Sequence, residues 1–130
     1  RLELPIMEET QMGMALGLAL EGFCVVSIYP RSDFLILAMN QLVNHIDKIG
    51  WMSDGKMQPR IIIRTSVGSK KPLDAGPQHT QDHTDALKLM LTTVNVVKLT
   101  DAEIIEPYYR RAYKDKDQRL WLFIENGALY

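Results

Sequence analysis

The segment Arg60-Ile61-Ile62-Ile63-Arg64-Thr65 is a short run of β-branched residues between charged and polar ones. A run of this length and composition is typical of a strand whose two faces are both buried. Three other segments share this apolar character: residues 23–28, 95–99 and 120–125. We expect all four to be strands of one sheet, buried on both faces.

Helical patterns separate the four expected strands. The predicted helices cover residues 9–21, 33–49, 82–91 and 101–113. The first two are rich in apolar residues at helical spacing and are expected to be largely buried. Thr80 and Thr100 are the candidate N-caps of the last two. Alternating strands and helices predict an α/β fold, a parallel sheet flanked by helices with a site at the carboxyl ends of the strands.

Length and composition fit one compact domain, residues 1–130. The chain is 46% apolar and 24% charged, as ordinary globular proteins are. A net charge of −1 gives no electrostatic attraction to nucleic acid or to an anionic membrane, so neither is an expected partner. The single cysteine, Cys24, lies inside the apolar run 23–28 and is expected to pack in the core.

Two places along the chain are candidates for chemistry. Residues 66–78 are rich in Gly, Pro, Lys and Ser and lead directly into His79, and irregular segments of that length inside a domain are usually functional. Near the start of the chain, Glu8 precedes Gly13 and Gly17, which stand four residues apart. Such glycines leave a bare helix face that another helix can approach closely. A carboxylate would therefore stand at the N-terminus of a helix beside a packed interface.

This Glu-Gly-Gly spacing resembles the pyrimidine-domain motif of thiamine-diphosphate enzymes. The chain as a whole is similar to the beta subunits of pyruvate and branched-chain 2-oxo-acid dehydrogenases, and its likeness spans nearly all 130 residues. The Gly-Pro-Gln-His-Thr-Gln of residues 76–81 favours these enzymes over transketolase and deoxyxylulose-phosphate synthase. The other matching segments are residues 33–34, 40–45, 51–55, 60–64 and 123–126. The implied fold is the transketolase-like, thiamine-diphosphate-binding pyrimidine domain.

The resemblance implies a role for each candidate residue. Glu8 would hydrogen-bond the aminopyrimidine ring of thiamine diphosphate and promote its imino tautomer, with Glu9 as the reserve candidate. Phe34 would pack on the pyrimidine ring, and Tyr29 would line the same pocket. His79 would take part in proton transfer near the reacting substrate carbon and in handover to the lipoyl group.

The resemblance also implies an activity and partners. The activity is oxidative decarboxylation of pyruvate or a related 2-oxo acid, with acyl transfer to the lipoyl domain of an acyltransferase. The chain lacks the Gly-Asp-Gly diphosphate motif, so an alpha-type subunit of a hetero-oligomer would supply Mg²⁺ and the diphosphate site. The chain would be one domain without the family's N-terminal segment and C-terminal domain, and its location intracellular, in the bacterial cytoplasm or the mitochondrial matrix.

The residues leave blander interpretations open. Glu8 can simply cap a helix, with Gly13 and Gly17 accommodating a neighbour within the same domain. Phe34 can be a core residue, and His79 a solvated loop residue. In that case the chain would be a non-catalytic, transketolase-like interaction or regulatory module.

A third hypothesis is a zinc hydrolase, in which His79 and His83, four residues apart, bind the metal from one helix face. That motif needs Glu where the chain has Asp82, and the sequence identifies no third ligand. His45 lies among apolar helix positions and is expected to be a hydrogen-bonded core or interface residue.

Two segments depart from the family pattern. Residues 9–11, Glu-Thr-Gln, stand where the family often has Met-Gly-Phe, so subunit contacts are expected to differ. Residues 69–74 replace a Gly- and Ala-rich loop, which leaves the substrate open.

Overall fold

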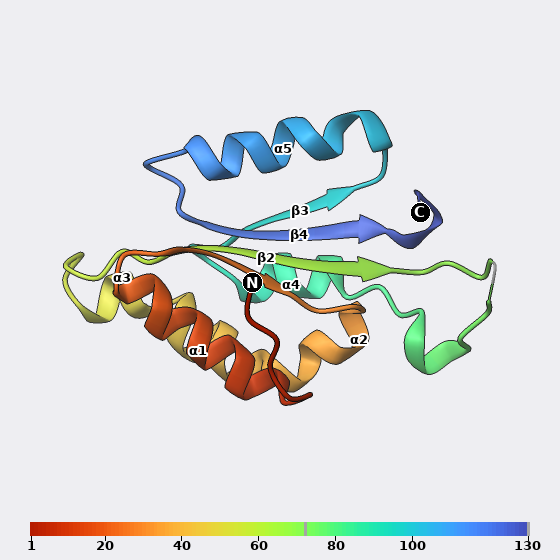
Figure 1. Cartoon of the computed structure of the whole chain (residues 1–130), viewed down its shortest axis with the longest axis horizontal. Helices are drawn as coiled ribbons and strands as arrows, with labels where there is room; N and C mark the ends of the chain where they lie inside the picture. Colours follow the sequence, from red (N-terminus) through yellow and green to blue (C-terminus); the bar gives the residue numbers. More distant parts are fainter. Residues whose placement is uncertain (72, 130) are drawn as a thin grey trace.

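Four parallel strands form one sheet in the order β1-β2-β4-β3 (Figure 1). The computed structural model describes residues 1–71 and 73–129; Pro72, which lies in the predicted long loop, and Tyr130 are outside them. The strands are β1 Cys24–Ile28, β2 Arg60–Val67, β3 Asn95–Leu99 and β4 Leu120–Asn126. The predicted α/β fold and all four strands are confirmed. Each strand forms from a short apolar run between polar residues.

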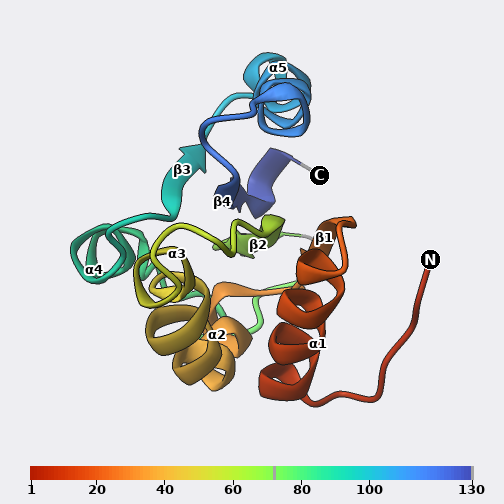
Figure 2. The same cartoon turned by 90° about the vertical axis from the view of Figure 1, so that its left-hand side faces the viewer.

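Helices cover both faces of the sheet unequally, with α5 on one face and α1 to α4 on the other (Figure 2). The α-helices are α1 Glu8–Leu20, α2 Ser32–Leu35, α3 Ile49–Met52, α4 Thr84–Met90 and α5 Ala102–Lys114. Tighter 3₁₀ turns form at Ile36–Ala38, Pro77–His79 and Gly127–Leu129. Within the described residues, every helix is too short or too polar to cross a membrane.

The core consists of two apolar clusters, one on each face of the sheet. Alternation along β2 divides its side chains, so that Ile61 and Ile63 join the larger cluster and Ile62 the smaller. The larger cluster receives Met12 from α1 and Leu87 from α4. The smaller packs against α5 and contains Leu99, Ala112, Trp121 and Phe123.

Strand β1 is only partly buried, which corrects the prediction of four strands covered on both faces. Val26 and Ile28 are each 51% exposed. β1 is an edge strand, and α5 packs over β3 and β4 at the other side of the sheet. Apolar composition alone could not reveal this, because the sequence does not state how many helices cover each face.

Helix α1 is likewise buried along one stripe rather than all round. Met12 and Ala19 face the sheet, whereas Met14 and Leu18 are each 39% exposed. The prediction of a largely buried helix therefore holds for one face of α1. The other face leaves apolar side chains uncovered.

The predicted single helix over residues 33–49 is wrong in its continuity. After α2 the chain winds through a 3₁₀ turn into a π-helix, Asn40–Ile46, before α3. In a π-helix residues five apart lie one above the other, so Leu42 and Asp47 both point inward, and the Asp47 N–H donates to the Leu42 carbonyl at 3.0 Å. Of the positions that periodicity predicted to be buried, Ala38 and Leu42 are buried, but Leu37 and His45 are exposed. Periodicity could not distinguish the two windings.

Asp47 is the buried residue that directly follows this π-helix. Its carboxylate accepts hydrogen bonds from the backbone N–H groups of Thr92, Thr93 and Val94 at 2.9, 2.7 and 3.1 Å. Lys48 Nζ also donates to it at 2.7 Å. Asp47 thereby joins the end of the π-helix to the start of β3.

Neither predicted threonine caps its helix. The Thr80 hydroxyl donates instead to the Gly76 carbonyl, and Asp82 accepts from the first backbone N–H of α4, that of Thr84. In α5 the cap is Asp101, whose carboxylate accepts from the Glu103 N–H at 2.9 Å. The N-cap residues are therefore His83 for α4, whose side chain makes no capping hydrogen bond, and Asp101 for α5; both stand later in the chain than predicted.

Replacing Asp101 by alanine is expected to lower the free energy of unfolding by about 1 kcal/mol, because an N–H of α5 loses its acceptor. The matched control is Thr100→Ala, expected to change it by less than about 0.5 kcal/mol. Urea denaturation of both variants measures the difference. Equal losses would contradict the assignment of the cap.

Candidate functional site

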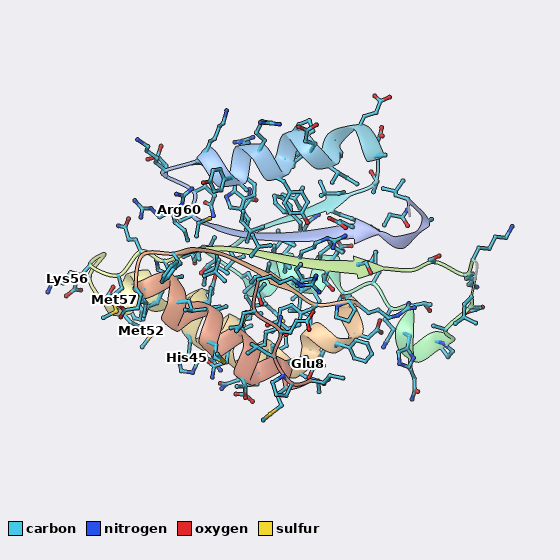
Figure 3. All side chains as sticks on the ribbon, in the orientation of Figure 1. Glu8, His45, Met52, Lys56, Met57 and Arg60 are labelled. Atoms are coloured by element: carbon cyan, nitrogen blue, oxygen red, sulfur yellow. The ribbon has the colours of Figure 1, made fainter. Side chains whose placement is uncertain are left out.

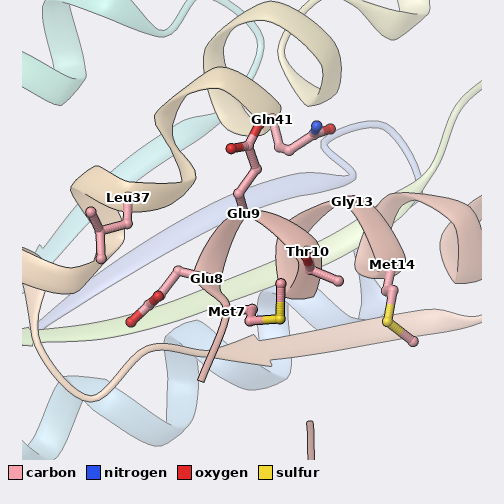
Figure 4. A pocket seen from close by; sticks show the side chains of 8 residues that line it. All are labelled: Met7, Glu8, Glu9, Thr10, Gly13, Met14, Leu37 and Gln41. Atoms are coloured by element: carbon pink, nitrogen blue, oxygen red, sulfur yellow. The ribbon is translucent and has the colours of Figure 1, made fainter. Parts of the chain in front are cut away.

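An open hollow of about 540 Å³ lies at the N-terminus of α1 (Figure 4). Glu8, half-buried, is the first residue of the helix, and Glu9 beside it is exposed. The Glu9 side chain points toward Gln41 and accepts a hydrogen bond from Asn40 at 2.8 Å, whereas the Glu8 side chain points away from Gln41. The two carboxylates thus have different surroundings. The hollow is lined by Met7, Glu8, Glu9, Thr10, Gly13, Met14, Leu37 and Gln41.

Hydrogen bonds tie the first turn of α1 to the carboxyl end of β1. Tyr29 is 1% exposed, and its hydroxyl donates to the Glu8 carbonyl and accepts from the Ser27 hydroxyl, both at 3.4 Å. Gln11 donates from the helix to Ser27 and to the Ile28 carbonyl at 3.0 and 2.9 Å. Burial raises the pKa of Tyr29 to about 12, against the effect of the Ser27 hydrogen bond and with that of the Glu8 charge. Tyr29 therefore stays protonated and supports the backbone of Glu8 from beneath.

Phe34 and His79 are brought together although 45 positions separate them in the chain. Their ring centroids lie 5.5 Å apart in an edge-to-face arrangement. Arg31 donates to the His79 carbonyl at 2.8 Å, and Gln81 donates to Asp33 at 3.0 Å. The turn that carries His79 is therefore fastened to the start of α2.

Glu8, Phe34 and His79 thus come from α1, α2 and the 3₁₀ turn after β2. Phe34 precedes Leu37, which lines the Glu8 hollow, by one helical turn. Tyr29 lies behind Glu8 rather than on the lining of the hollow, and its contact with a cofactor stays a prediction. His45 is exposed on the π-helix, so it is not a core residue, and its expected place in an interface stays a prediction. Figure 3 shows Met52, Lys56 and Met57 near the start of β2, well separated from Glu8.

The geometry does not support the zinc hypothesis. His79 lies in a 3₁₀ turn and His83 is the residue before α4, so no helix presents both. Burial favours a higher pKa for Asp82, but hydrogen bonds from Lys98 and Thr84 lower it to about 2, and these partners occupy its carboxylate. Across residues 1–71 and 73–129, no three His, Cys, Asp or Glu side chains form a group that could hold a metal ion.

The two glycines of α1 do not serve close packing inside this chain. A methyl group on Gly13 would meet the Gln41 side chain at 3.6 Å, an ordinary van der Waals contact. A methyl group on Gly17 would meet nothing within 4 Å. The interpretation that both glycines accommodate a neighbour within the same domain therefore finds no support.

Sequence comparison finds similar proteins of one kind. A pyruvate dehydrogenase E1 component subunit beta from Gracilaria tenuistipitata var. liui is 36% identical over 80 residues, which cover 62% of this chain and 24% of that protein. The beta-4, chloroplastic subunit of Oryza sativa subsp. japonica is 34% identical over 80 residues, or 62% of this chain and 20% of that protein. Identity to the subunit from Rickettsia bellii is 24%, but over 99% of this chain and 38% of that protein. The chain is similar to a part of pyruvate dehydrogenase E1 beta subunits.

The relationship covers a part of those E1 beta subunits. The chain spans about a quarter of the length of the first relatives and about two fifths of the Rickettsia protein. No protein-family model matches it. The resemblance to E1 beta subunits inferred from the sequence is confirmed, whereas the roles of Glu8, Phe34, Tyr29 and His79 remain predictions.

Sequence analysis missed a charged cluster at the carboxyl ends of β2 and β4 in this E1 beta relative. Glu125 is 2% exposed and accepts from Arg64 Nη2 at 2.7 Å and from the Tyr109 hydroxyl at 2.6 Å. Hydrogen bonding to Glu125 raises the pKa of Arg64, and burial together with Glu125 raises the pKa of Tyr109. The sequence feature that could have predicted this cluster is the pair of opposite charges, Arg64 and Glu125, that follow two apolar runs. The cluster fixes α5 to the carboxyl ends of the central strands β2 and β4.

Tyr109→Phe is expected to lower the free energy of unfolding by about 2 kcal/mol, since buried Glu125, ion-paired with Arg64, loses a short hydrogen bond from the Tyr109 hydroxyl. The matched control is Tyr108→Phe, because both tyrosine rings pack against Phe123 and only that of Tyr109 carries a hydroxyl bonded to Glu125. Guanidinium denaturation measures both. A loss of equal size in the two variants would show that the hydrogen bond contributes nothing.

Proposed function

We propose that this chain is the beta-type, pyrimidine-binding half of a thiamine-diphosphate-dependent 2-oxo-acid dehydrogenase. Its substrate would be pyruvate or a related 2-oxo acid, and the acyl group would pass to the lipoyl domain of an acyltransferase. An intracellular location, the bacterial cytoplasm or the mitochondrial matrix, accompanies that role. The relationship to E1 beta subunits supports the class of enzyme.

The observation that carries the proposal is the position of Glu8. It is half-buried at the start of α1, in a hollow whose other wall, Leu37 and Gln41, belongs to the stretch that begins with Phe34. A partner helix that packed on the open face at Gly17 would deepen this hollow and desolvate the carboxylate.

The residues present fit the pyrimidine end of thiamine diphosphate. Glu8 offers a carboxylate that accepts a hydrogen bond from a ring nitrogen, and Phe34, one helical turn before Leu37 of the same hollow, offers an aromatic surface. Tyr29 fixes the Glu8 backbone through its hydrogen bond at 3.4 Å, while Arg31 fixes the carbonyl of His79. When bound, the cofactor supplies stabilisation of the carbanion formed on decarboxylation. The His79 imidazole would hold or deliver a proton on the substrate side.

The other half of the site would come from an alpha-type subunit with the Gly-Asp-Gly motif, which would hold Mg²⁺ and the diphosphate. The apolar side chains of Met14, Leu18, Val26 and Ile28 are exposed on α1 and β1. Uncovered apolar groups on neighbouring elements are typical of a surface that a partner covers. We therefore propose a hetero-oligomer.

A native pull-down with this chain as bait, read by mass spectrometry, tests the proposal. The expected result is recovery of a protein with the Gly-Asp-Gly motif, and binding of thiamine diphosphate with Mg²⁺ to the purified pair in a calorimeter. Recovery of a partner without that motif, or a pair that does not bind the cofactor, would favour the non-catalytic interaction or regulatory module. The exposed apolar surface fits that second function too.

A further inference from the structure

A second pocket, of about 210 Å³, lies between the start of the α2 stretch and α4. Its position is separate from the Glu8 hollow, and the two share no lining residue. We name it the α2–α4 pocket. It is lined by Ser32, Leu35, Ile36, Met39, His83, Ala86, Leu87 and Met90.

The walls of the α2–α4 pocket are mainly apolar. Leu35 and Leu87 belong to the large core cluster and are 1% and 4% exposed. Ile36 and Met90, each 47% exposed, stand where the pocket meets solvent. Such walls favour the apolar body of a ligand over water.

Two polar groups of the same pocket have no partner. Ser32 is 1% exposed, and its hydroxyl oxygen makes no hydrogen bond in the described part of the chain. The Nε2 atom of His83 is buried and equally unpartnered among those residues. Nearly all buried polar atoms in proteins have a partner, so two orphans beside one cavity point to a polar group that is bound there.

We propose that the α2–α4 pocket binds a small neutral apolar molecule carrying one hydroxyl group. A cavity of about 150 Å³ lined by apolar side chains holds benzene. The larger α2–α4 pocket therefore has room for a ring with one substituent. A ligand hydroxyl both donates and accepts, so it can bond the Ser32 hydroxyl and the His83 imidazole after small side-chain rotations.

This proposal does not rest on the proposed function. Neither Ser32 nor His83 is among the residues assigned to thiamine diphosphate, although Ser32 lies two positions before Phe34 and His83 four after His79. The pocket exists in the chain alone and can be tested without a partner subunit.

Phenol and toluene are the probes, because they have the same number of heavy atoms and differ in the hydroxyl. Saturation-transfer NMR and calorimetry on the purified chain are expected to show one phenol site, with at least fivefold weaker binding of toluene. In Ser32→Ala the two affinities should lie within about twofold, since one hydroxyl partner is gone. Absence of phenol binding, or toluene bound as tightly as phenol by the unmodified chain, overturns the proposal.

The place of binding is tested by filling the pocket. Ala86→Phe should abolish phenol binding, and Lys88→Ala, an exposed change on the same helix outside the pocket, should leave it unchanged. Circular dichroism checks that each variant folds. If Ala86→Phe does not fold, Met90→Trp closes the pocket from its exposed side instead. Phenol binding that persists in a folded, filled variant also overturns the proposal.

Discussion

Asp47→Ala is expected to lower the free energy of unfolding by about 3–4 kcal/mol, although Asp47 is not among the residues that line the candidate site. The variant leaves the backbone N–H groups of Thr92, Thr93 and Val94 without their acceptor. Val94 is only 5% exposed, so water cannot replace the carboxylate freely. A buried donor without a partner, such as the Val94 N–H, costs about 1–3 kcal/mol, and the lost hydrogen bonds of the more exposed Thr92 and Thr93 bring the expected total to about 3–4 kcal/mol. Chemical denaturation near neutral pH measures it.

Acid should reveal the same residue. Burial alone favours a higher pKa for Asp47, but the hydrogen bonds from Lys48, Thr93 and Thr92 outweigh it and hold the pKa well below its usual range. The folded pKa lies below the unfolded value of about 3.9, so the stabilisation is present above that pH and is lost as the pH falls below it. Asp82, with a pKa of about 2, titrates in the same window. Asp47→Asn should therefore flatten the acid limb of the stability curve without removing it.

The control is Asp117→Asn, an exposed carboxylate in the turn before β4. It should change stability by less than about 0.5 kcal/mol and leave the acid limb as it is. If Asp47→Ala were no more harmful than this control, Asp47 would not be the joint between the π-helix and β3.

Glu8→Gln is expected to lower the decarboxylation rate of the complex formed with an alpha-type partner by at least about 100-fold. This rests on the proposed function, since glutamine keeps the shape of the side chain but cannot share a proton with a ring nitrogen. General acid–base groups typically contribute about 10² to 10⁴ in rate. Steady-state kinetics with pyruvate and related 2-oxo acids measures the loss and the substrate together.

Glu9→Gln is the matched control, because Glu9 is adjacent to Glu8 but exposed, and its carboxylate accepts a hydrogen bond from Asn40. Its side chain points toward Gln41, whereas that of Glu8 points away from Gln41. The rate of Glu9→Gln should stay within about threefold of the unmodified complex, well short of the loss expected for a proton-transfer group. A full rate in Glu8→Gln would remove the assigned role from Glu8. The reverse pattern, with Glu9 essential, would transfer the role to the reserve candidate.

Local patterns predicted the elements of the fold well and their environment less well. The runs at 60–65 and 120–125 are strands because β-branched and apolar side chains suit a buried sheet. The exposure of Val26 depends on the order of strands and on the single helix over that face, which no local pattern encodes. Asp47 and Glu125 were missed for the same reason, since their partners are far away in the sequence.

The candidate site followed from a family motif more than from physics. Spacing placed Glu8 at the start of a helix, and the structure confirms that position. The contact of Phe34 with His79 depends on how the segment after β2 folds back onto α2. Hydrogen bonds from Arg31 to His79 and from Gln81 to Asp33 direct that return, and no local pattern indicates them.

That pair of hydrogen bonds has an evolutionary consequence. Residues 79 and 81 are held by hydrogen bonds with Arg31 and Asp33, at the start of α2. The orientation of His79 therefore does not depend on the sequence between Val67 and Gly76. Insertions, deletions and changes of charge there should accumulate among relatives while the histidine keeps its place. A lineage could thus explore new substrates through one variable segment without rebuilding the rest of its site.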